Sequence, residues 1–543
     1  MESKFLTPTQ LWQSFDPEGK LDVSFVSNQT VDDIIIRSFY FTAFRDEEGL
    51  IRTFGRILMP VDCPKNNKKF ILYLARPVED PMPVVMQIAA KGYPVGYIDL
   101  SGEGADSTIY EGCYAYGRYQ EAKDNLHNCT PSALASPVLL WTKMQCRFVS
   151  LVLQLYPKVR PIAFSNAETN EILWPLCAKD ARIYGGVSVL GSGIVQEESD
   201  DASVQEDENA QKWAIALSPQ AYAKYTACPM LVVTAANHAG HAVDKLDALV
   251  NLLPVPDMCA TVVSNRLCTQ ISDNTSYTLW RWIEGRYFER KELPKNPTIT
   301  YELGEGSIQF SVTADVSEKK MVEQSLYFAY NEEDSAYRAW QCQTKKGDAE
   351  PTFNVRVTGV DKVVFAYASV RYRDGVEIAS TMLRIPLPDD MPRRRLTPSK
   401  LLYDTSMGAS FFAETKDLVL DSTLFGVGQS PNGISGLYTD KGDLVSFCVG
   451  ESRRVSPEGA FSLSAYSPEE RHFSIVITVW ENGHYRDYTA GVFLRGTEEW
   501  QRVRLDADDF RDNALLPMSG WQNMRKIRIM HAEGILLNNM LWT

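Results

Sequence analysis

The feature of this sequence that most constrains its fold is a change of periodicity near residue 298. Before that point, short apolar and β-branched runs alternate with longer segments of helical periodicity. After it, apolar and polar residues alternate at every second position, as in strands that bury one face. Alternating strands and helices are typical of a mostly parallel sheet with helices on both faces, whereas runs of short strands are typical of sandwiches. The sequence therefore predicts an α/β part followed by all-β parts.

Within the α/β part, Ile34–Phe44 and Leu50–Leu58 flank a charged turn and predict a hairpin. The further strands predicted are Lys69–Ala75, Pro94–Leu100, Pro161–Phe164, Ile183–Leu190, Met230–Thr234 and Cys259–Ser264. The helices predicted are Pro83–Lys91, Ser136–Tyr156, Thr169–Lys179, Asp244–Leu253 and Ser276–Tyr287. An acidic insertion, Glu197–Glu208, interrupts the alternation, and we interpret it as a solvated surface loop or the start of a helix.

Two proline-rich stretches divide the 543 residues, which exceed the usual domain size of about 100–200 residues several times. The first lies at Pro294 and Pro297, and the second at Pro386–Pro392, beside three arginines that we interpret as part of a charged linker. Trp340 is a core candidate of the part between them. The predicted domains are an α/β domain over 1–293, an immunoglobulin-like or fibronectin-like β-sandwich over 294–390, and a second all-β sandwich over 391–543.

Composition and charge exclude several functional classes. The chain has 69 acidic and 55 basic residues, a net charge of −14, which would repel a phosphate backbone and disfavours nucleic acid as a partner. No run approaches the roughly 20 apolar residues of a membrane span, and the amino terminus lacks a signal-peptide pattern. The ten cysteines are scattered without a CxxC motif, so we expect reduced thiols in a cytoplasmic protein, with no metal and no cofactor.

Three strings in the α/β part carry a resemblance. Tyr97–Gly104 (YIDLSGEG) begins within a predicted strand and runs past its end, and Cys177–Arg182 (CAKDAR) runs past the end of a predicted helix. Cys228–Asn237 (CPMLVVTAAN) contains the predicted strand Met230–Thr234. In this order they resemble the α/β-hydrolases, and among these the acyl esterases of the acetyl-xylan esterase and cephalosporin-C deacetylase type. The resemblance covers residues 30–290.

The resemblance implies a Ser-Asp-His triad, and the matching positions lack it. A serine hydrolase of this fold needs a G-x-S-x-G elbow that exposes the serine hydroxyl. The matching residues are Ser165–Thr169, where Ala167 occupies the nucleophile position. Asn237 occupies the acid position and cannot carry the charge that stabilises an imidazolium. The histidine is expected near Asn265–Gln270, which contains Cys268 but no histidine.

The positions of the histidines support this reading. The chain contains His127, His238, His241, His472, His484 and His531. None lies between His241 and His472, where the order Ser, Asp, His would require the base. The usual triad is therefore absent from the sequence.

Other residues could replace the triad. Ser165 is a candidate for a displaced nucleophile. Cys268 could be a reactive thiol or an inert buried cysteine. Glu168 could be a general base or a residue that the helix dipole favours. His238 and His241, with Asp244 as a third ligand, could bind a metal ion, although such a pair on a loop more often forms a polar surface.

The carboxy-terminal part resembles the jelly-roll carbohydrate-binding modules. The resemblance lies in Trp500–Leu505, Asp509–Phe510, Trp521 and Ile535–Trp542. Sugar binding needs flat aromatic faces with polar side chains beside them. The densest such cluster, and the predicted ligand site, comprises Trp480, His484, Tyr485, Arg486 and Tyr488. The alternative is that these rings belong to the core of the sandwich.

The reading that follows is a carbohydrate-esterase-like α/β-hydrolase that has lost its triad and acts by binding or scaffolding, with a carbohydrate or acylated sugar as the expected ligand. The alternative is an active acyl esterase with non-standard catalytic residues. A third reading is a structural subunit whose hydrolase face has become an oligomer interface. The sequence leaves a homo-oligomer open.

Overall fold

The structure is a computed structural model of the chain. It describes residues 5–166, 169–191, 208–238, 243–267, 273–288, 293–315, 320–347, 352–395, 400–408, 412–415, 425–440, 443–447 and 459–543. Among the sequence-based predictions, those for Ala167, Glu168, His241, Cys268 and most of Glu197–Glu208 lie outside these ranges.

The chain divides into two compact units. The first comprises Met1–Thr234, Lys245–Val262 and Leu279–Lys295. The second comprises Ala235–Asp244, Val263–Thr278 and Asn296–Thr543. Two short segments from the α/β part of the sequence therefore belong to the second unit.

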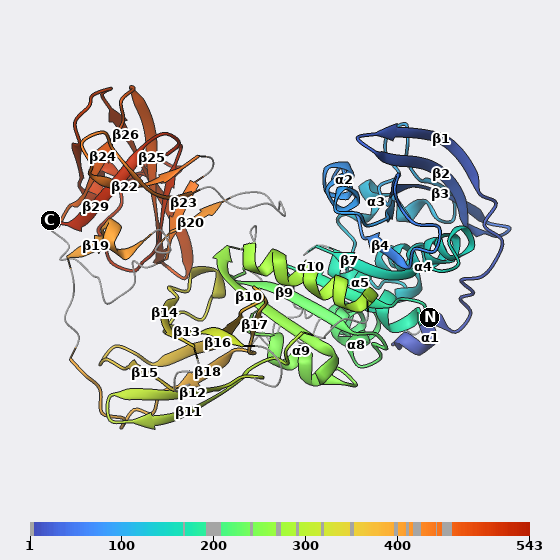
Figure 1. Cartoon of the computed structure of the whole chain (residues 1–543), viewed down its shortest axis with the longest axis horizontal. Coiled ribbons are helices and arrows are strands. Elements are labelled where there is room, and N and C mark those ends of the chain that lie inside the picture. The colour runs from blue at the N-terminus through green and yellow to red at the C-terminus, as the bar shows by residue number, and fades with distance from the viewer. Residues whose placement is uncertain are drawn as a thin grey trace. The chain divides into compact units, whose positions relative to one another are not determined.

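The α/β part is built on a mixed ten-stranded sheet in the order β1-β2-β3-β5-β4-β7-β8-β9-β10, with β6 paired to β3 (Figure 1). The strands β4, β5, β7, β8 and β9 pair in parallel, and β1, β2, β3 and β6 are antiparallel to their neighbours. The strands are β1 (Ser24–Val31), β2 (Ile34–Arg45), β3 (Gly49–Pro60), β4 (Lys69–Tyr73), β5 (Val95–Ile98), β6 (Ile109–Gly112), β7 (Arg160–Ser165), β8 (Gly185–Val189), β9 (Met230–Asn237) and β10 (Cys259–Leu267). All the strands predicted in this part are present.

The helices that accompany this sheet are α1 (Pro8–Trp12), α2 (Met82–Ala90), α3 (Tyr119–Ala122), α4 (Pro137–Leu155), α5 (Asn170–Lys179), α7 (Glu208–Ala216), α8 (Pro219–Ala223), α9 (Leu246–Leu252) and α10 (Asp273–Phe288). The five predicted helices are confirmed to within a few residues. In α4, Pro137 stands in the first turn, where its missing N–H costs nothing, and almost every residue after it up to Val152 is buried. The helix α7 begins at Glu208, the last residue of the acidic insertion.

The sequence pattern did not predict β1. Every residue of β1 is exposed, so the strand has no alternation of apolar and polar residues for a pattern to detect. It forms because a two-residue turn joins it to β2, which has a strong apolar pattern. Its place in the sheet is at the edge.

The middle part, from Thr298 to Pro386, has two antiparallel sheets, β11-β12-β15 and β14-β13-β16-β17, with β18 paired to β16. The strands are β11 (Thr298–Gly304), β12 (Ser307–Thr313), β13 (Met321–Tyr330), β14 (Gln341–Lys346), β15 (Thr352–Arg356), β16 (Val363–Tyr372), β17 (Glu377–Ala379) and β18 (Leu383–Pro386). The predicted core residue Trp340 is buried, and its ring meets Tyr367 edge-on at 5.1 Å between centroids.

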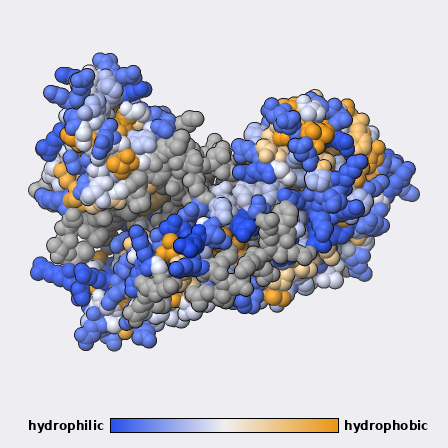
Figure 2. Space-filling view, in the orientation of Figure 1, coloured by the Kyte–Doolittle hydropathy of each residue, from blue (hydrophilic) through white to orange (hydrophobic). Residues whose placement is uncertain are grey.

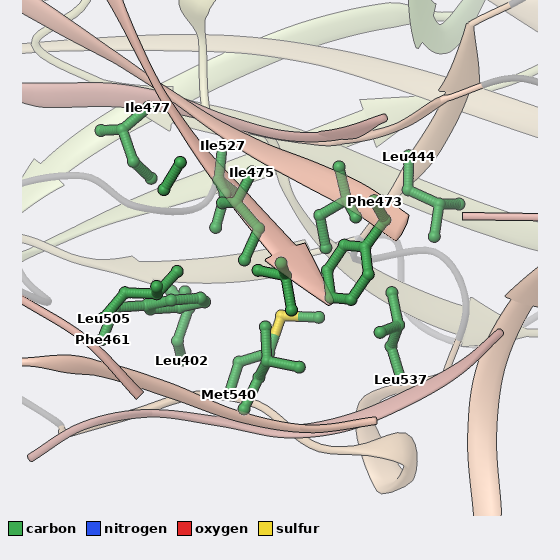
Figure 3. Close-up of a cluster of buried hydrophobic side chains, with 14 of the residues drawn as sticks. Leu402, Leu444, Phe461, Phe473, Ile475, Ile477, Leu505, Ile527, Leu537 and Met540 are labelled. Carbon is green, nitrogen blue, oxygen red and sulfur yellow. The ribbon is translucent and has the colours of Figure 1, made fainter. Parts of the chain in front are cut away.

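The carboxy-terminal part is a sandwich of two antiparallel sheets, β21-β22-β29-β24-β27 with β19, and β20-β23-β28-β25-β26. The strands are β19 (Leu401–Tyr403), β20 (Ala413–Thr415), β21 (Phe425–Gln429), β22 (Ser435–Thr439), β23 (Asp443–Ser446), β24 (Phe461–Tyr466), β25 (Arg471–Glu481), β26 (His484–Leu494), β27 (Gln501–Leu505), β28 (Met524–Met530) and β29 (Leu536–Trp542). Figure 3 shows the core between them, where Phe473 and Ile475 of one sheet face Leu537 and Met540 of the other. Alternate residues of both sheets thus share one hydrophobic core.

Two predictions from the composition concern membrane-spanning helices and the state of the cysteines. None of the helices within them is long and apolar enough to cross a membrane. The eight cysteines in the described ranges are free thiols.

Candidate functional site

Ser165, the candidate for a displaced nucleophile, is the last residue of β7 and is fully buried. Its hydroxyl donates to Oδ1 of Asn170 at 2.9 Å, and Ser188 donates to the same oxygen at 2.6 Å. Asn170 opens α5, so this network fixes the helix to the ends of two strands. A side chain at Gly191 would collide with the Asn170 amide, since its Cβ would lie 2.0 Å from Nδ2. The geometry gives Ser165 a structural role, because its hydroxyl has no exposed surface.

Asn166, which follows β7, and Thr169, which precedes α5, form hydrogen bonds with each other. Asn166 Oδ1 accepts hydrogen bonds from the backbone N–H and the hydroxyl of Thr169, at 3.3 and 3.2 Å. The Thr169 hydroxyl oxygen accepts from the N–H of Asn166 at 3.2 Å. Beside Asn166, burial raises the pKa of Tyr73, so its phenol stays protonated in the folded protein. Ala167, which the sequence resemblance predicts at the nucleophile position, lies outside the described residues.

Asn237, which the sequence resemblance predicts at the acid position, ends β9 and belongs to the second unit. Its side chain is buried, and its Nδ2 donates to the backbone carbonyls of Ser335 at 3.1 Å and Arg338 at 2.9 Å. Both partners are acceptors only, so the group that faces them must be a donor. An amide satisfies this requirement and a carboxylate does not.

The surroundings of Asn237 form a larger set of contacts with the segment 332–340, which lies between β13 and β14. Ser335 donates its hydroxyl hydrogen to the carbonyl of His238, and Trp340 Nε1 donates to the carbonyl of Ala236 at 3.3 Å. Arg338, whose side chain is fully buried, forms an ion pair with Asp244, and its Nη2 lies 2.8 Å from Oδ2. We call the described residues 235–238 and 243–244, together with the segment 332–340, the β9 clamp.

Arg338 is the centre of the β9 clamp. Besides its ion pair, its guanidinium donates to the carbonyls of Glu332 at 2.9 Å and Glu333 at 2.7 Å. Its guanidinium carbon also lies 3.7 Å from the centroid of the Phe365 ring. A buried guanidinium with its donors satisfied holds its neighbours in one arrangement. The end of β9 is therefore a packed structural junction within the second unit.

The predicted sugar-binding residues lie on β25 and β26 and are divided between the two faces of that hairpin. Trp480 pairs with Tyr485, and their rings meet edge-on at 4.5 Å. Tyr488 is three residues further along β26, so it points to the opposite face, where it is buried in the sandwich core. The five residues therefore do not form a single aromatic surface.

Tyr485 is engaged within the second unit. Its ring stacks on Tyr337 with 3.7 Å between centroids and 19° between planes, and its hydroxyl donates to Glu332 at 3.3 Å. Arg525 forms an ion pair with the same Glu332 at 2.9 Å. Burial, the largest effect on Glu332, raises the pKa of its carboxyl, which Arg525 opposes. One face of Tyr485 is thus covered, and Trp480, 37% exposed, presents the more open ring.

The other two predicted ligand residues, His484 and Arg486, differ from Tyr488 by even numbers of positions and lie on its face of the hairpin. Arg486 forms ion pairs with Glu481 at 3.2 Å and Asp512 at 3.5 Å. The exposed His484 lies near the Arg486 guanidinium, with Nε2 and Nη2 3.3 Å apart. The open ring of Trp480 and the ion pair of Arg486 with Glu481 therefore lie on opposite faces of the hairpin.

An imidazole–carboxylate pair lies in the first unit. His127 Nε2 and Glu171 Oε1 are 2.7 Å apart, and the imidazole side chain is 52% exposed. Its ring lies against Trp213 at 4.4 Å between centroids. The hydrogen bond to Glu171 raises the pKa of His127, and burial opposes this rise. Glu171 stands in the first turn of α5, where a carboxylate is favoured by the helix dipole.

A cavity of about 290 Å³ opens at the other end of α5. Its walls include Trp12, Phe15, Lys179 and Arg182. Arg182 is already paired with Asp180 at 2.6 Å. Ser165, Asn166 and Thr169 do not line this cavity.

Comparisons with known proteins give similarity at the level of structure only. No family model matches the sequence, and no curated protein matches it. The chain is similar to the acetyl xylan esterase from Paenibacillus sp. R4, with 12% identity, a TM-score of 0.36, and coverage of 49% of this chain and 88% of that one. For acetyl xylan esterase 1 from Thermoanaerobacterium sp. JW/SL YS485 the identity is 12%, the TM-score 0.36, and the coverage 52% and 96%. For the glucuronoyl esterase from Solibacter usitatus the values are 12%, 0.35, 49% and 86%.

Sequence reasoning did not identify the partners of these site residues. Ser335 and Arg338 contact Asn237 across separations of 98 and 101 residues. Glu332 and Tyr337 contact Tyr485 from a different part of the second unit. One signal was present in the sequence: Tyr485 and Tyr488 differ by an odd number of positions on one strand, which places them on opposite faces.

Proposed function

We propose that this chain is a carbohydrate-esterase-like α/β-hydrolase without a working Ser-Asp-His triad, and that it acts by binding or scaffolding. The α/β sheet and the three strings of the sequence that resemble the family support the fold part of the proposal. The residues at the triad positions support the rest. An expected ligand is a carbohydrate or an acylated sugar.

The observation that carries the proposal is the hydrogen bonding of Asn237. Its Nδ2 donates hydrogen bonds to two backbone carbonyl oxygens, and a carbonyl oxygen can only accept a hydrogen bond. A triad acid must instead be an acceptor for the N–H of an imidazole and must be negatively charged. The side chain at this position is therefore committed to holding the β9 clamp together.

The state of Ser165 also supports the proposal. A nucleophilic serine needs an exposed hydroxyl and a base that takes its proton. Ser165 has no exposed surface, and its hydroxyl donates to a side-chain amide oxygen. Without nucleophile and base, an active site retains only binding and oxyanion effects, about 10³–10⁴-fold over water.

The test is hydrolysis of 4-nitrophenyl acetate and of acetylated xylan by the full chain, together with labelling by a fluorophosphonate probe. Ser165→Ala is the matched control. We expect no saturable hydrolysis, no probe adduct and no difference between the two proteins. Saturable turnover or a stoichiometric adduct would overturn the non-catalytic reading.

A second candidate, an acyl hydrolase with non-standard residues, is favoured by the pair of His127 and Glu171. A carboxylate that orients an imidazole is the base half of a triad, and this pair stands at the start of the helix that follows β7. If hydrolysis is found, His127→Gln should abolish it under this candidate. Hydrolysis that survives both His127→Gln and Ser165→Ala would exclude these two residues as its source.

The ligand part of the proposal is tested at Trp480. Xylo-oligosaccharides are titrated into the full chain, and binding is measured by isothermal titration calorimetry. Binding that is kept in Trp480→Tyr, which retains a flat ring, and lost in Trp480→Ala supports a sugar site at this hairpin. Binding that is unchanged in Trp480→Ala would place any sugar site elsewhere.

A further inference from the structure

The strand β1 is an open edge of the large sheet. It pairs with β2 along Ser24–Val31, and within the described residues it pairs with no other strand. All eight residues are exposed, including Phe25 at 52%, Val26 at 54% and Val31 at 41%. Figure 2 shows hydrophobic surface over the region where Figure 1 draws β1 and β2. A long, exposed and apolar edge is a template for pairing with another strand.

The direction of the backbone groups of β1 follows from its turn. Asp32 and Asp33 have φ angles of 48° and 60°, as in a two-residue type I′ turn, so Val31 and Ile34 exchange both hydrogen bonds. Hydrogen-bonded and non-hydrogen-bonded pairs alternate along an antiparallel ladder. The N–H and C=O groups of Asn28 and Thr30 therefore point away from β2, toward the open edge.

The composition of β1 differs from that of most other edge strands in the described part of the chain, although the shorter edge strand β21 (FGVGQ) is also uncharged. Strands β11, β14 and β27 contain charged residues, among them Glu302, Lys345 and Arg502. Charges of this kind prevent edge-to-edge pairing. The sequence of β1, SFVSNQTV, has no charge and no proline over eight residues.

The two ends of β1 carry opposite charges. The turn after the strand holds Asp32 and Asp33, both exposed. Near the start of the strand lie Lys20 and Arg45, whose side chains are 86% and 58% exposed and which share Asp22 between them. An antiparallel pairing of two β1 strands brings the acidic turn of each copy to the basic end of the other. A parallel pairing would bring like charges together.

We propose that β1 is a homodimer interface, in which the β1 strands of two copies of this chain pair antiparallel about a two-fold axis. In the register that uses the free groups of both Asn28 and Thr30, Asn28 of one copy lies opposite Thr30 of the other and exchanges two hydrogen bonds with it. The two-fold axis then repeats these bonds and places the two Gln29 side chains opposite each other. The partner is a second copy because an uncharged strand with opposite charges at its ends complements itself.

The test uses charge at the axis. Gln29→Lys and Gln29→Glu each place like charges opposite one another, and Gln29→Ala is the neutral control. Sedimentation of the full chain, at concentrations up to about 100 µM, measures association in the range of small transient interfaces. We expect wild type and Gln29→Ala to dimerise, each charged variant to associate about fivefold more weakly, and an equimolar mixture of the two charged variants to form a heterodimer at least as strong as the wild-type dimer.

Three outcomes would overturn the proposal. A wild-type chain that stays monomeric over this range excludes the dimer. A dimer that both charged variants retain unchanged lies on another surface. If the charged variants associate weakly and their association does not recover when they are mixed, the added charge weakens the dimer without the two Gln29 side chains facing each other. Because the Gln29 side chain is exposed, circular dichroism of all three variants should match that of wild type.

Discussion

At the scale of the residue, the amide of Asn237 fixes what the end of β9 can do. We expect Asn237→Asp to lower the free energy of unfolding by about 1–3 kcal/mol at pH 7, because a carboxylate would face two carbonyl oxygens and leave them without a donor. Urea denaturation measures this loss. Asn354→Asp, on an exposed position of β15, is the matched control and should have little effect.

The same variant should recover part of its stability at low pH. A protonated carboxyl group can donate one hydrogen bond, so the burial of Asp at position 237 favours its neutral form. The difference between Asn237→Asp and wild type should therefore be smaller at pH 4 than at pH 7. A difference that grows as the pH falls would contradict the donor role of this amide.

His127 is a second residue with a defined pH response. The hydrogen bond to Glu171 raises its pKa in the folded protein, so its stabilising contribution is complete below the ordinary histidine pKa and is lost as the pH rises through the raised value. His127→Gln should accordingly lower the thermal midpoint more at pH 6 than at pH 9. In Glu171→Gln, the pKa of His127, measured by NMR, should fall. A pKa that is the same in both proteins would show that the pair does not set it.

At the scale of the element, the segment 332–340 depends on the ion pair at its centre. Asp244→Asn leaves the buried guanidinium of Arg338 without its counter-charge, and we expect a loss of about 3 kcal/mol. Glu333→Gln is the matched control, because the Glu333–Arg384 pair on the same segment is more than half exposed and should contribute at most about 1 kcal/mol. Urea denaturation compares the two, and equal effects would contradict the burial argument.

The elements also show which helices and strands can be predicted from local sequence patterns. The helix α4 and the strands β2 and β3 have strong apolar periodicity, and they were predicted to within a few residues. The strand β1 has none, because an exposed edge strand buries neither face. Local periodicity reports burial, so an element that buries nothing leaves no pattern.

At the scale of the whole molecule, each compact unit is made of several chain segments, and the second unit includes segments from both sides of the predicted domain boundary near residue 293. The segments Ala235–Asp244 and Val263–Thr278 belong to the second unit although they precede that boundary. A fragment 1–293 would lack the partners of Asn237 and Asp244 and would expose buried groups, so we expect it to be less soluble and to unfold at a lower temperature than the first unit in the full chain. Differential scanning calorimetry of both proteins tests this. A fragment as stable as the full chain would contradict it.

The sequence by itself determined the α/β part and the all-β parts, because periodicity is a local property. Only the tertiary structure decided what Asn237 does, and that Tyr485 stacks on Tyr337 while Tyr488 is buried in the core. These contacts join residues about 100 or more positions apart, and such pairings depend on how packed elements meet, which no local pattern encodes.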